Sequence, residues 1–158
     1  MVPICDFTNT TTFSTPSDVN IKSSSASSFK NIKCYLCNAR SLNNKLANLE
    51  NLLSSEAYDA LIFTETWFRA GTPDSLFCGG SPYNLHRCDR SDGHGGVAIF
   101  THRNLCASKV DLPSAEFFDA ICLDLNIHNS LSYRFLAVYN PPRATIASSE
   151  CLKLSSIR

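Results

Sequence analysis

The stretch Ile32-Lys33-Cys34-Tyr35-Leu36-Cys37-Asn38 decides the fold, because apolar side chains recur at every second position from Ile32 to Leu36. This period of two predicts a short strand that ends at Asn38. Leucines then follow at helical spacing, on one face of a predicted helix: Leu42, Leu46, Leu49 and Leu53. The compact apolar run 59–64 predicts a second strand with both faces covered. A strand, a helix and a strand in this order indicate a right-handed crossover within a sheet.

The rest of the chain adds strands more than helices. Apolar runs or alternating apolar residues predict further strands over 97–100, 121–127 and 133–139. One more helix is predicted over 144–157, where the apolar residues are roughly in helical phase. The pattern therefore predicts an α/β fold with many short strands and few helices.

The composition favours one folded domain behind a polar tail. Twelve of the 21 residues from Thr8 to Ser28 are Ser or Thr, without apolar periodicity, so we expect a disordered Ser/Thr-rich tail over 1–30 and a domain over 31–158. Fourteen Lys and Arg residues balance fourteen Asp and Glu residues. This balance argues against a general electrostatic binder of nucleic acids, so any such contact must be local.

The sequence predicts an intracellular protein, in the nucleus or cytoplasm and not secreted, without a membrane partner. Its longest apolar run spans only 135–139, against the roughly 18 to 20 residues that a membrane-spanning helix needs. The first residues contain neither the basic nor the long apolar segment of a signal peptide. We expect the eight cysteines to be mostly reduced, with Cys34, Cys106 and Cys122 buried among apolar neighbours.

Three polar residues lie at or just beyond the ends of predicted strands: Asn38, Glu65 and Tyr139. Ligands gather at the carboxyl ends of strands in layered α/β folds, so these side chains are candidates for one site. A carboxylate at the end of a buried strand is costly unless it is paired or binds a cation, and Mg²⁺ is the natural partner of such oxygen ligands. The alternative is that Glu65 is merely an exposed strand terminus.

Five motifs then occur in a familiar order, with the leucine-spaced helix between the first two: Asn38-Ala39-Arg40-Ser41-Leu42, Thr64-Glu65-Thr66-Trp67-Phe68, Arg87-Cys88-Asp89-Arg90, Gly95-Gly96-Val97-Ala98-Ile99-Phe100 and Val138-Tyr139-Asn140-Pro141-Pro142. This set resembles the endonuclease domain of non-LTR (LINE-type) retrotransposons, which belongs to the endonuclease/exonuclease/phosphatase superfamily. The resemblance implies a two-sheet α/β sandwich. It also implies Mg²⁺-dependent nicking of DNA for target-primed reverse transcription, without a small-molecule cofactor.

The resemblance also implies roles for individual residues. Asn38 matches the Asn that orients the phosphate or a metal-bound water, and it is a candidate metal ligand. Glu65 matches the Glu that binds the divalent metal. Tyr139 matches the Tyr that approaches the phosphate and stabilises its developing charge. Phosphodiester hydrolysis needs a metal and fixed hydrogen-bond donors of this kind.

The departures from the family pattern predict an incomplete catalyst. The family carries a later Asp-x-Asn motif and an Asp-His pair, whereas neither Asp nor His follows Tyr139 in this sequence. We therefore expect a partial sandwich that lacks its C-terminal part, in which the strands over 121–127 and 133–139 lack partners. Residues of one catalytic unit act together, so we expect little turnover. A non-enzymatic remnant with weak or no nucleic-acid binding is the alternative.

Other residues have competing interpretations. Cys34-x-x-Cys37 permits a cysteine-based metal-binding module, but residues three apart in a strand point to opposite faces. The arginines Arg87, Arg90 and Arg103 form either a phosphate-facing patch or salt bridges with nearby aspartates. Trp67 either stacks on a base or, as we expect, packs under its loop.

Overall fold

The computed structural model describes residues 10–12, 32–113, 118–127 and 131–141. In chain order the elements are β1 (Thr10–Thr12), β2 (Lys33–Asn38), α1 (Leu46–Ser54), β3 (Ala60–Thr64), α2 (Ser75–Cys78), β4 (Tyr83–Cys88), β5 (Val97–His102), β6 (Cys106–Val110), β7 (Asp119–Ile127) and β8 (Leu131–Tyr139). The strands form a five-stranded sheet of order β1-β2-β3-β5-β4 and a three-stranded sheet of order β6-β7-β8. Strands β2 and β3 run parallel, with α1 between them in the chain, and the other pairs are antiparallel.

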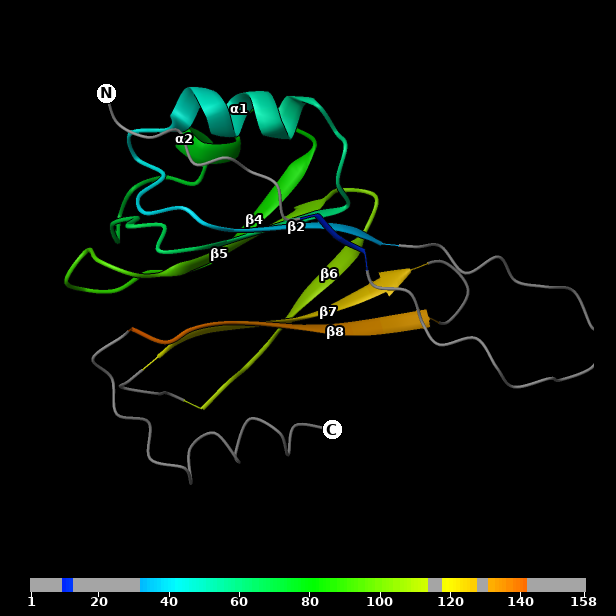
Figure 1. The fold of residues 1–158 in the computed structure, drawn as a ribbon. Coiled ribbons are helices and arrows are strands. Elements are labelled where there is room, and N and C mark those ends of the chain that lie inside the picture. Colours follow the sequence, from blue (N-terminus) through cyan, green and yellow to red (C-terminus); the bar gives the residue numbers. More distant parts are fainter. Residues whose placement is uncertain (1–9, 13–31, 114–117, 128–130, 142–158) are drawn as a thin grey trace, which may run out of the picture.

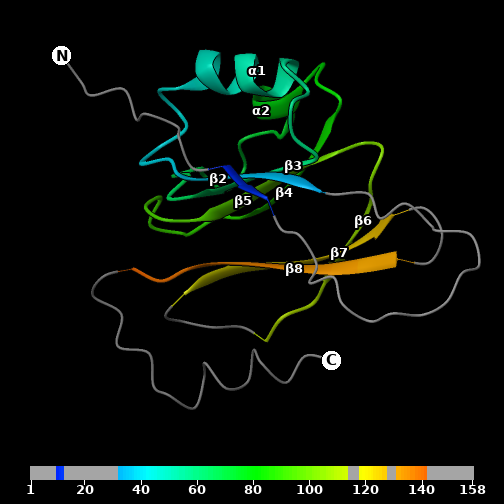
Figure 2. The same ribbon diagram turned by 45° about the vertical axis from the view of Figure 1, so that its right-hand side comes forward.

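The described elements stack in three layers, with α1 and α2 on one face of the larger sheet and the smaller sheet on the other (Figures 1 and 2). Strand β5 is covered on both faces. Ala98 and Phe100 belong to the core beneath the helices, whereas Val97 and Ile99 pack in the core between the sheets. Such two-sided burial explains why β5 reads as a continuous apolar run.

The predicted α/β class, with two sheets and few helices, is confirmed. The leucine-spaced helix corresponds to α1, although it begins at Leu46 and Leu42 lies in the preceding turn. Three strands were missed: β1 within the predicted tail, β4, and β6 at the edge of the smaller sheet. The helix predicted over 144–157 lies outside the described residues.

Two predictions about burial and pairing are wrong. Cys106 is exposed, because it begins the edge strand β6, where Ala107 is the residue that packs against the core. The strands over 121–127 and 133–139 do not lack partners, since β7 pairs with β6 on one side and with β8 on the other. Of the tail predicted to be disordered, the structure describes only Thr10–Thr12, which form β1 against β2. The other residues of the segment 1–30 lie outside the described part of the chain.

Candidate active site

The loops that follow the parallel strands β2 and β3 are joined by backbone hydrogen bonds. Ala39 N–H donates to Thr64 O (2.8 Å), and Ser41 N–H donates to Glu65 O (2.8 Å). Parallel pairing brings both carboxyl ends to the same edge of the sheet, and Asn38 is the register partner of Thr64. The loops therefore carry Asn38 and Glu65 as one unit.

Glu65 is the centre of a polar cluster that draws on three strands. Its carboxylate oxygen Oε1 accepts a hydrogen bond from Asn38 Nδ2 (2.7 Å) and another from the Tyr139 hydroxyl (3.2 Å). Asn38 is itself oriented, since its Oδ1 accepts the N–H of Arg40 (3.2 Å). Within the described part of the chain, no hydrogen bond reaches the second Glu65 oxygen, Oε2. The structure thus brings together the three residues singled out from the sequence.

The backbone around Glu65 is held in an uncommon conformation. Glu65 (φ 52°) and Trp67 (φ 55°) are both in the left-handed region, which long side chains rarely adopt. Thr66 between them is fully buried, whereas Glu65 and Trp67 are half-buried. Such conformations cost about 1 to 3 kcal/mol each and cluster at functional sites. Two such residues therefore flank buried Thr66 in the loop that carries Glu65.

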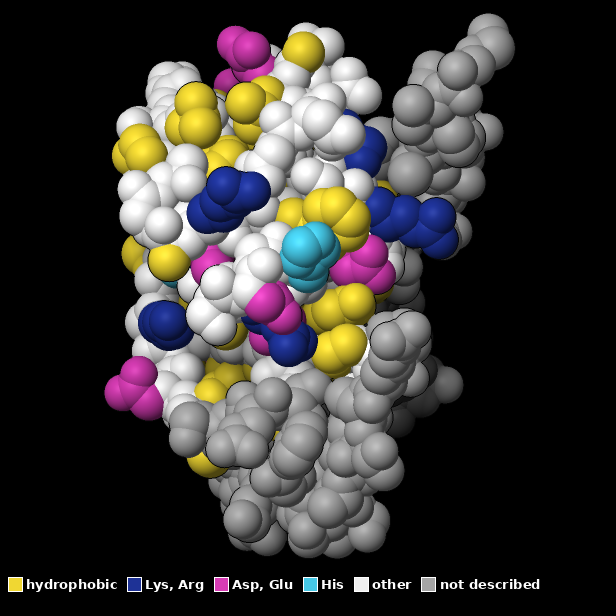
Figure 3. Space-filling model, turned by 90° about the vertical axis from the view of Figure 1, so that its left-hand side faces the viewer, with side chains coloured by type: hydrophobic (Ala, Val, Ile, Leu, Met, Phe, Trp, Pro, Cys, Tyr) yellow, Lys and Arg dark blue, Asp and Glu magenta, His cyan; other side chains and the backbone are white. Residues whose placement is uncertain are grey.

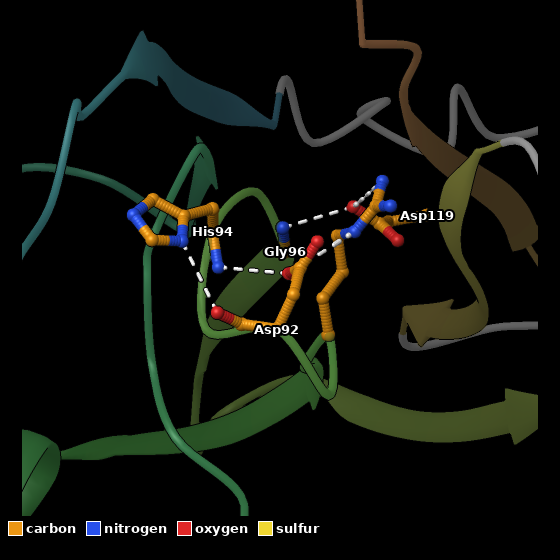
Figure 4. A network of polar contacts seen from close by, with 5 residues as sticks. Asp92, His94, Gly96 and Asp119 are labelled. Carbon is orange, nitrogen blue, oxygen red and sulfur yellow. Dashed lines mark hydrogen bonds and ion pairs between the residues drawn. The ribbon is translucent and has the colours of Figure 1, made fainter.

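A third loop, 93–96, packs against this edge through its glycines. Gly95 O accepts the N–H of Trp67 (2.9 Å), and Gly96 N–H donates to Asp119 Oδ2 (2.9 Å). Figure 4 shows this contact beside the hydrogen bonds between Asp92 and His94. A Cβ on Gly95 would lie 3.2 Å from Tyr139 Cε1, so a side chain there would crowd the Tyr139 ring.

Asp119 supports the site by accepting the hydrogen bond from the Gly96 backbone, although the sequence prediction missed this residue. It is buried (8% exposed) and lies opposite Tyr139 in the β7–β8 register. Burial raises the pKa of its carboxyl, while the hydrogen bond from Gly96 and the charge of Arg90 (3.9 Å) oppose that rise. The available sequence signal was an aspartate at the start of an apolar strand, downstream of a Gly-Gly pair.

Burial also raises the pKa of Tyr139, and the charge of Glu65 and the hydrogen bond to it add to the effect. The phenol therefore keeps its proton at neutral pH and remains a donor. Since its partner is a carboxylate that can only accept, the contact fixes the direction of the hydrogen bond.

Lys45 is a second supporting residue that the sequence prediction missed. Its ammonium group donates to the carbonyl oxygens of Ala39 (2.6 Å), Arg40 (3.0 Å) and Ser41 (2.9 Å). These bonds use the three donors of a lysine side chain. They clamp the loop that follows Asn38, in which Arg40 and Ser41 have positive φ angles.

Two of the three arginines, Arg87 and Arg90, form salt bridges, as one of the two interpretations expected, whereas no ion pair of Arg103 is seen among the described residues. Arg87 Nε lies 3.1 Å from Asp74 Oδ1 and 3.4 Å from Asp89 Oδ2. Arg90 Nε lies 3.5 Å from Asp92 Oδ1. With these partners, Arg87 and Arg90 are neutralised locally and are not a free phosphate-facing patch.

The cysteine pair is not arranged as a metal site. Cys34 is buried in the core between the sheets, whereas Cys37 packs against the core beneath the helices. Burial raises the pKa of the Cys34 thiol to about 11, so the free side chain is a protonated thiol at neutral pH. The two sulfur atoms therefore face opposite sides of β2.

Glu65 and its neighbours fit a loosely held divalent cation. Among the described ranges, no three His, Cys, Asp or Glu side chains converge as a protein-built metal cage would require. The Glu65 oxygen Oε2 remains available, and Mg²⁺ typically takes one or two carboxylates and completes its shell with waters and substrate phosphates. Asn38 turns its amide nitrogen toward Glu65, so in this arrangement it orients the carboxylate.

A comparison with protein-family models gives one match. The model of the endonuclease/exonuclease/phosphatase family matches residues 20–153, most of the chain, and includes all three clustered residues. The chain belongs to this family. The endonuclease/exonuclease/phosphatase assignment indicates a nuclease- or phosphatase-type hydrolase domain, of a kind that generally uses a divalent metal and generally acts on nucleic acids.

Two further findings accompany this family assignment. A search of curated proteins gives no significant match. Neither helix in the described part of this endonuclease/exonuclease/phosphatase chain is long and apolar enough to cross a membrane.

Proposed function

We propose that this chain is a retrotransposon-derived endonuclease domain of the non-LTR type, which binds DNA phosphates with Mg²⁺ at Glu65 and has little catalytic turnover by itself. The observation that carries the proposal is the Glu65 carboxylate, which Asn38 and Tyr139 hold at one oxygen. The order of the five motifs supports the retrotransposon subtype.

Each clustered residue has a role in this proposal. Glu65 Oε2 would hold the cation, while Asn38 keeps the carboxylate in place through Oε1. Tyr139 keeps its one phenolic hydrogen, which it donates to Glu65 and would redirect to an anionic oxygen that enters the site once a cation binds the carboxylate. Bound Mg²⁺ would neutralise the negative charge that grows on the phosphate during hydrolysis.

The expected weakness of turnover follows from the sequence given. Neither Asp nor His occurs after Tyr139, so the sequence given lacks the Asp-x-Asn and Asp-His residues that the family resemblance implies for orienting and activating the attacking water. General-base help is typically worth about 10² to 10⁴ in rate, and positioning contributes more. The chain should therefore bind better than it cleaves.

The proposal is tested by DNA binding and by plasmid nicking, each with Mg²⁺ and with EDTA. Fluorescence anisotropy of a labelled duplex measures binding by the wild type, by Glu65→Gln and by the control Glu50→Gln, which changes an exposed carboxylate on α1. We expect Mg²⁺ to strengthen binding by the wild type and the control but not by Glu65→Gln. Nicking should stay close to the metal-free background.

Two results would contradict the proposal in different ways. An equal response of wild type and Glu65→Gln to Mg²⁺ would remove Glu65 as the metal-binding residue. Rapid nicking by the wild type that Glu65→Gln and Asn38→Ala both abolish would show a complete catalyst, against the expectation of low turnover.

A further inference from the structure

Trp67 and His94 form an aromatic pair at the edge of the candidate site. Their ring centroids lie 5.1 Å apart with the planes tilted by 58°. His94 is exposed and Trp67 is half-buried, and Trp67 is absent from the core clusters found among the described residues. This differs from the expectation that Trp67 packs under its loop.

The face in Figure 3 places a histidine against a hydrophobic patch, with acidic and basic side chains around it. Trp67 follows Glu65 by two residues in the same loop, and buried Thr66 separates these two half-buried side chains. The aromatic pair and the carboxylate are therefore joined by one short loop, which the Trp67–Gly95 backbone hydrogen bond ties to the loop of His94.

Hydrogen bonds hold the Trp67 backbone, and both the backbone and the ring of His94. Trp67 N–H donates to Gly95 O (2.9 Å), and Trp67 O accepts from Asn43 Nδ2 (2.6 Å). His94 N–H donates to Asp92 Oδ1 (3.0 Å), and the His94 ring nitrogen Nδ1 lies 3.1 Å from Asp92 O. Since a carbonyl oxygen only accepts, Nδ1 carries the hydrogen in this contact. The His94 ring is thus held by a hydrogen bond, and the Trp67 ring lies against it on a backbone that is itself hydrogen-bonded.

We propose that Trp67 and His94 form a stacking platform for a nucleobase of the DNA strand whose phosphate lies at Glu65. The inference rests on the proposed function and adds the base-binding element to it. Every base has a π-face, so a stacking platform binds single strands or unstacked bases with little sequence preference. It also supplies affinity that a chain with no net charge does not obtain from long-range attraction.

The sequence offers a direct probe, because Trp67 is the only tryptophan of the chain. Intrinsic fluorescence of the full chain is titrated in EDTA with a short single-stranded oligonucleotide, and in parallel with an abasic strand of the same length and charge. We expect the base-containing strand to quench Trp67 and the abasic strand to leave it nearly unchanged. Equal quenching by both strands, or no quenching at a concentration where anisotropy shows binding, would overturn the proposal. The absence of binding by either strand would overturn it as well.

Variants separate stacking from a structural role. Anisotropy of the labelled strand should show at least about fivefold weaker binding for Trp67→Ala, the lower end of what loss of base stacking produces. Trp67→Phe keeps a π-face and should restore most of the affinity, and His94→Ala should reduce it. If Trp67→Phe binds as poorly as Trp67→Ala while both retain the wild-type circular dichroism and melting temperature, the stacking role is wrong.

The test of the stacking platform can fail independently of the test of the proposed function, because the fluorescence titrations contain no metal. Quenching without any Mg²⁺ response would uphold the platform and contradict the metal role of Glu65. A Mg²⁺ response that depends on Glu65, without quenching, would uphold the metal role and contradict the platform.

Discussion

The Tyr139 hydroxyl donates a hydrogen bond to Glu65 Oε1 at 3.2 Å, and so joins two side chains that are 74 residues apart in the sequence. The bond connects the smaller sheet, which carries Tyr139 on β8, to the end of β3 in the larger sheet. Asn38 reaches the same oxygen from β2. The position of the Glu65 carboxylate therefore depends on how the two sheets pack together.

This contact predicts an abnormal titration of Tyr139. Burial and the Glu65 charge raise its pKa above the ordinary 10.0, so the folded state retains the proton more tightly than the unfolded state. Its contribution to stability is complete below pH 10.0 and is lost as the pH rises through the folded pKa. Ultraviolet difference titration of wild type minus Tyr139→Phe isolates the transition, which Glu65→Gln should move to lower pH. A transition unaffected by Glu65→Gln would show that the two groups do not interact in solution.

The contribution of Asp119 to stability should change with pH in the opposite direction to that of an ion-paired surface carboxylate. Burial raises its pKa above 3.8, so its contribution to stability falls as the pH rises from that value through the folded pKa. Asp119→Asn retains an oxygen for Gly96 N–H and removes this loss, whereas Asp119→Leu leaves that N–H unpaired at a cost of about 1 to 3 kcal/mol. Urea unfolding at acidic and neutral pH measures both effects. A wild type that gains stability over Asp119→Asn as the pH rises would contradict the assignment.

Lys45 is predicted to stabilise the loop after Asn38. Lys45→Met removes three hydrogen bonds to carbonyl oxygens, and we expect a loss of about 1 to 3 kcal/mol because those oxygens are partly reachable by water. Lys33→Met, at an exposed position of β2, is the matched control and should change little. Hydrogen exchange should speed up at the amides of Ala39 and Ser41 in Lys45→Met alone. Unchanged exchange there would mean that the clamp is not needed.

The core beneath α1 gives a prediction that is independent of the site. Leu53 is 1% exposed and packs in that core, so Leu53→Ala should lower the free energy of unfolding by about 2 to 5 kcal/mol. Leu36 on β2 is 50% exposed, and Leu36→Ala should stay within about 0.5 kcal/mol of the wild type. Urea denaturation of both variants checks the pair. Similar losses in the two would contradict the three-layer packing.

Local pattern was sufficient for the elements that have a strong apolar signal. The leucine spacing of α1 reflects its one buried face, and the apolar run of β5 reflects burial on both faces. The period of two located β2 but not its burial, since Tyr35 is buried and Leu36 is 50% exposed. Strands β4 and β6 were missed because they carry polar residues on partly exposed positions, and their pairing with β5 and β7 is set by the tertiary fold.

The candidate site likewise contains residues that the local sequence predicts and residues that only the tertiary fold identifies. Asn38 and Glu65 stand at strand ends, where polar residues after an apolar run are conspicuous in the sequence. The roles of Asp119 and Lys45 depend on backbone groups that they meet only after folding: Gly96 N–H for one and three loop carbonyls for the other. No local sequence pattern predicts these hydrogen bonds. The Trp67–His94 pair likewise arises from contact between two loops.

The position of the divalent ion is the central claim, and nuclear magnetic resonance of the ¹⁵N-labelled chain with Mn²⁺ in place of Mg²⁺ tests it most directly. Paramagnetic broadening marks the residues nearest the ion. The account predicts that the side-chain amide of Asn38 and the backbone amides of Glu65 and Tyr139 broaden first, and that Glu65→Gln removes this effect. Broadening that is strongest elsewhere, for example around the exposed carboxylate of Asp111, and that persists in Glu65→Gln would contradict it.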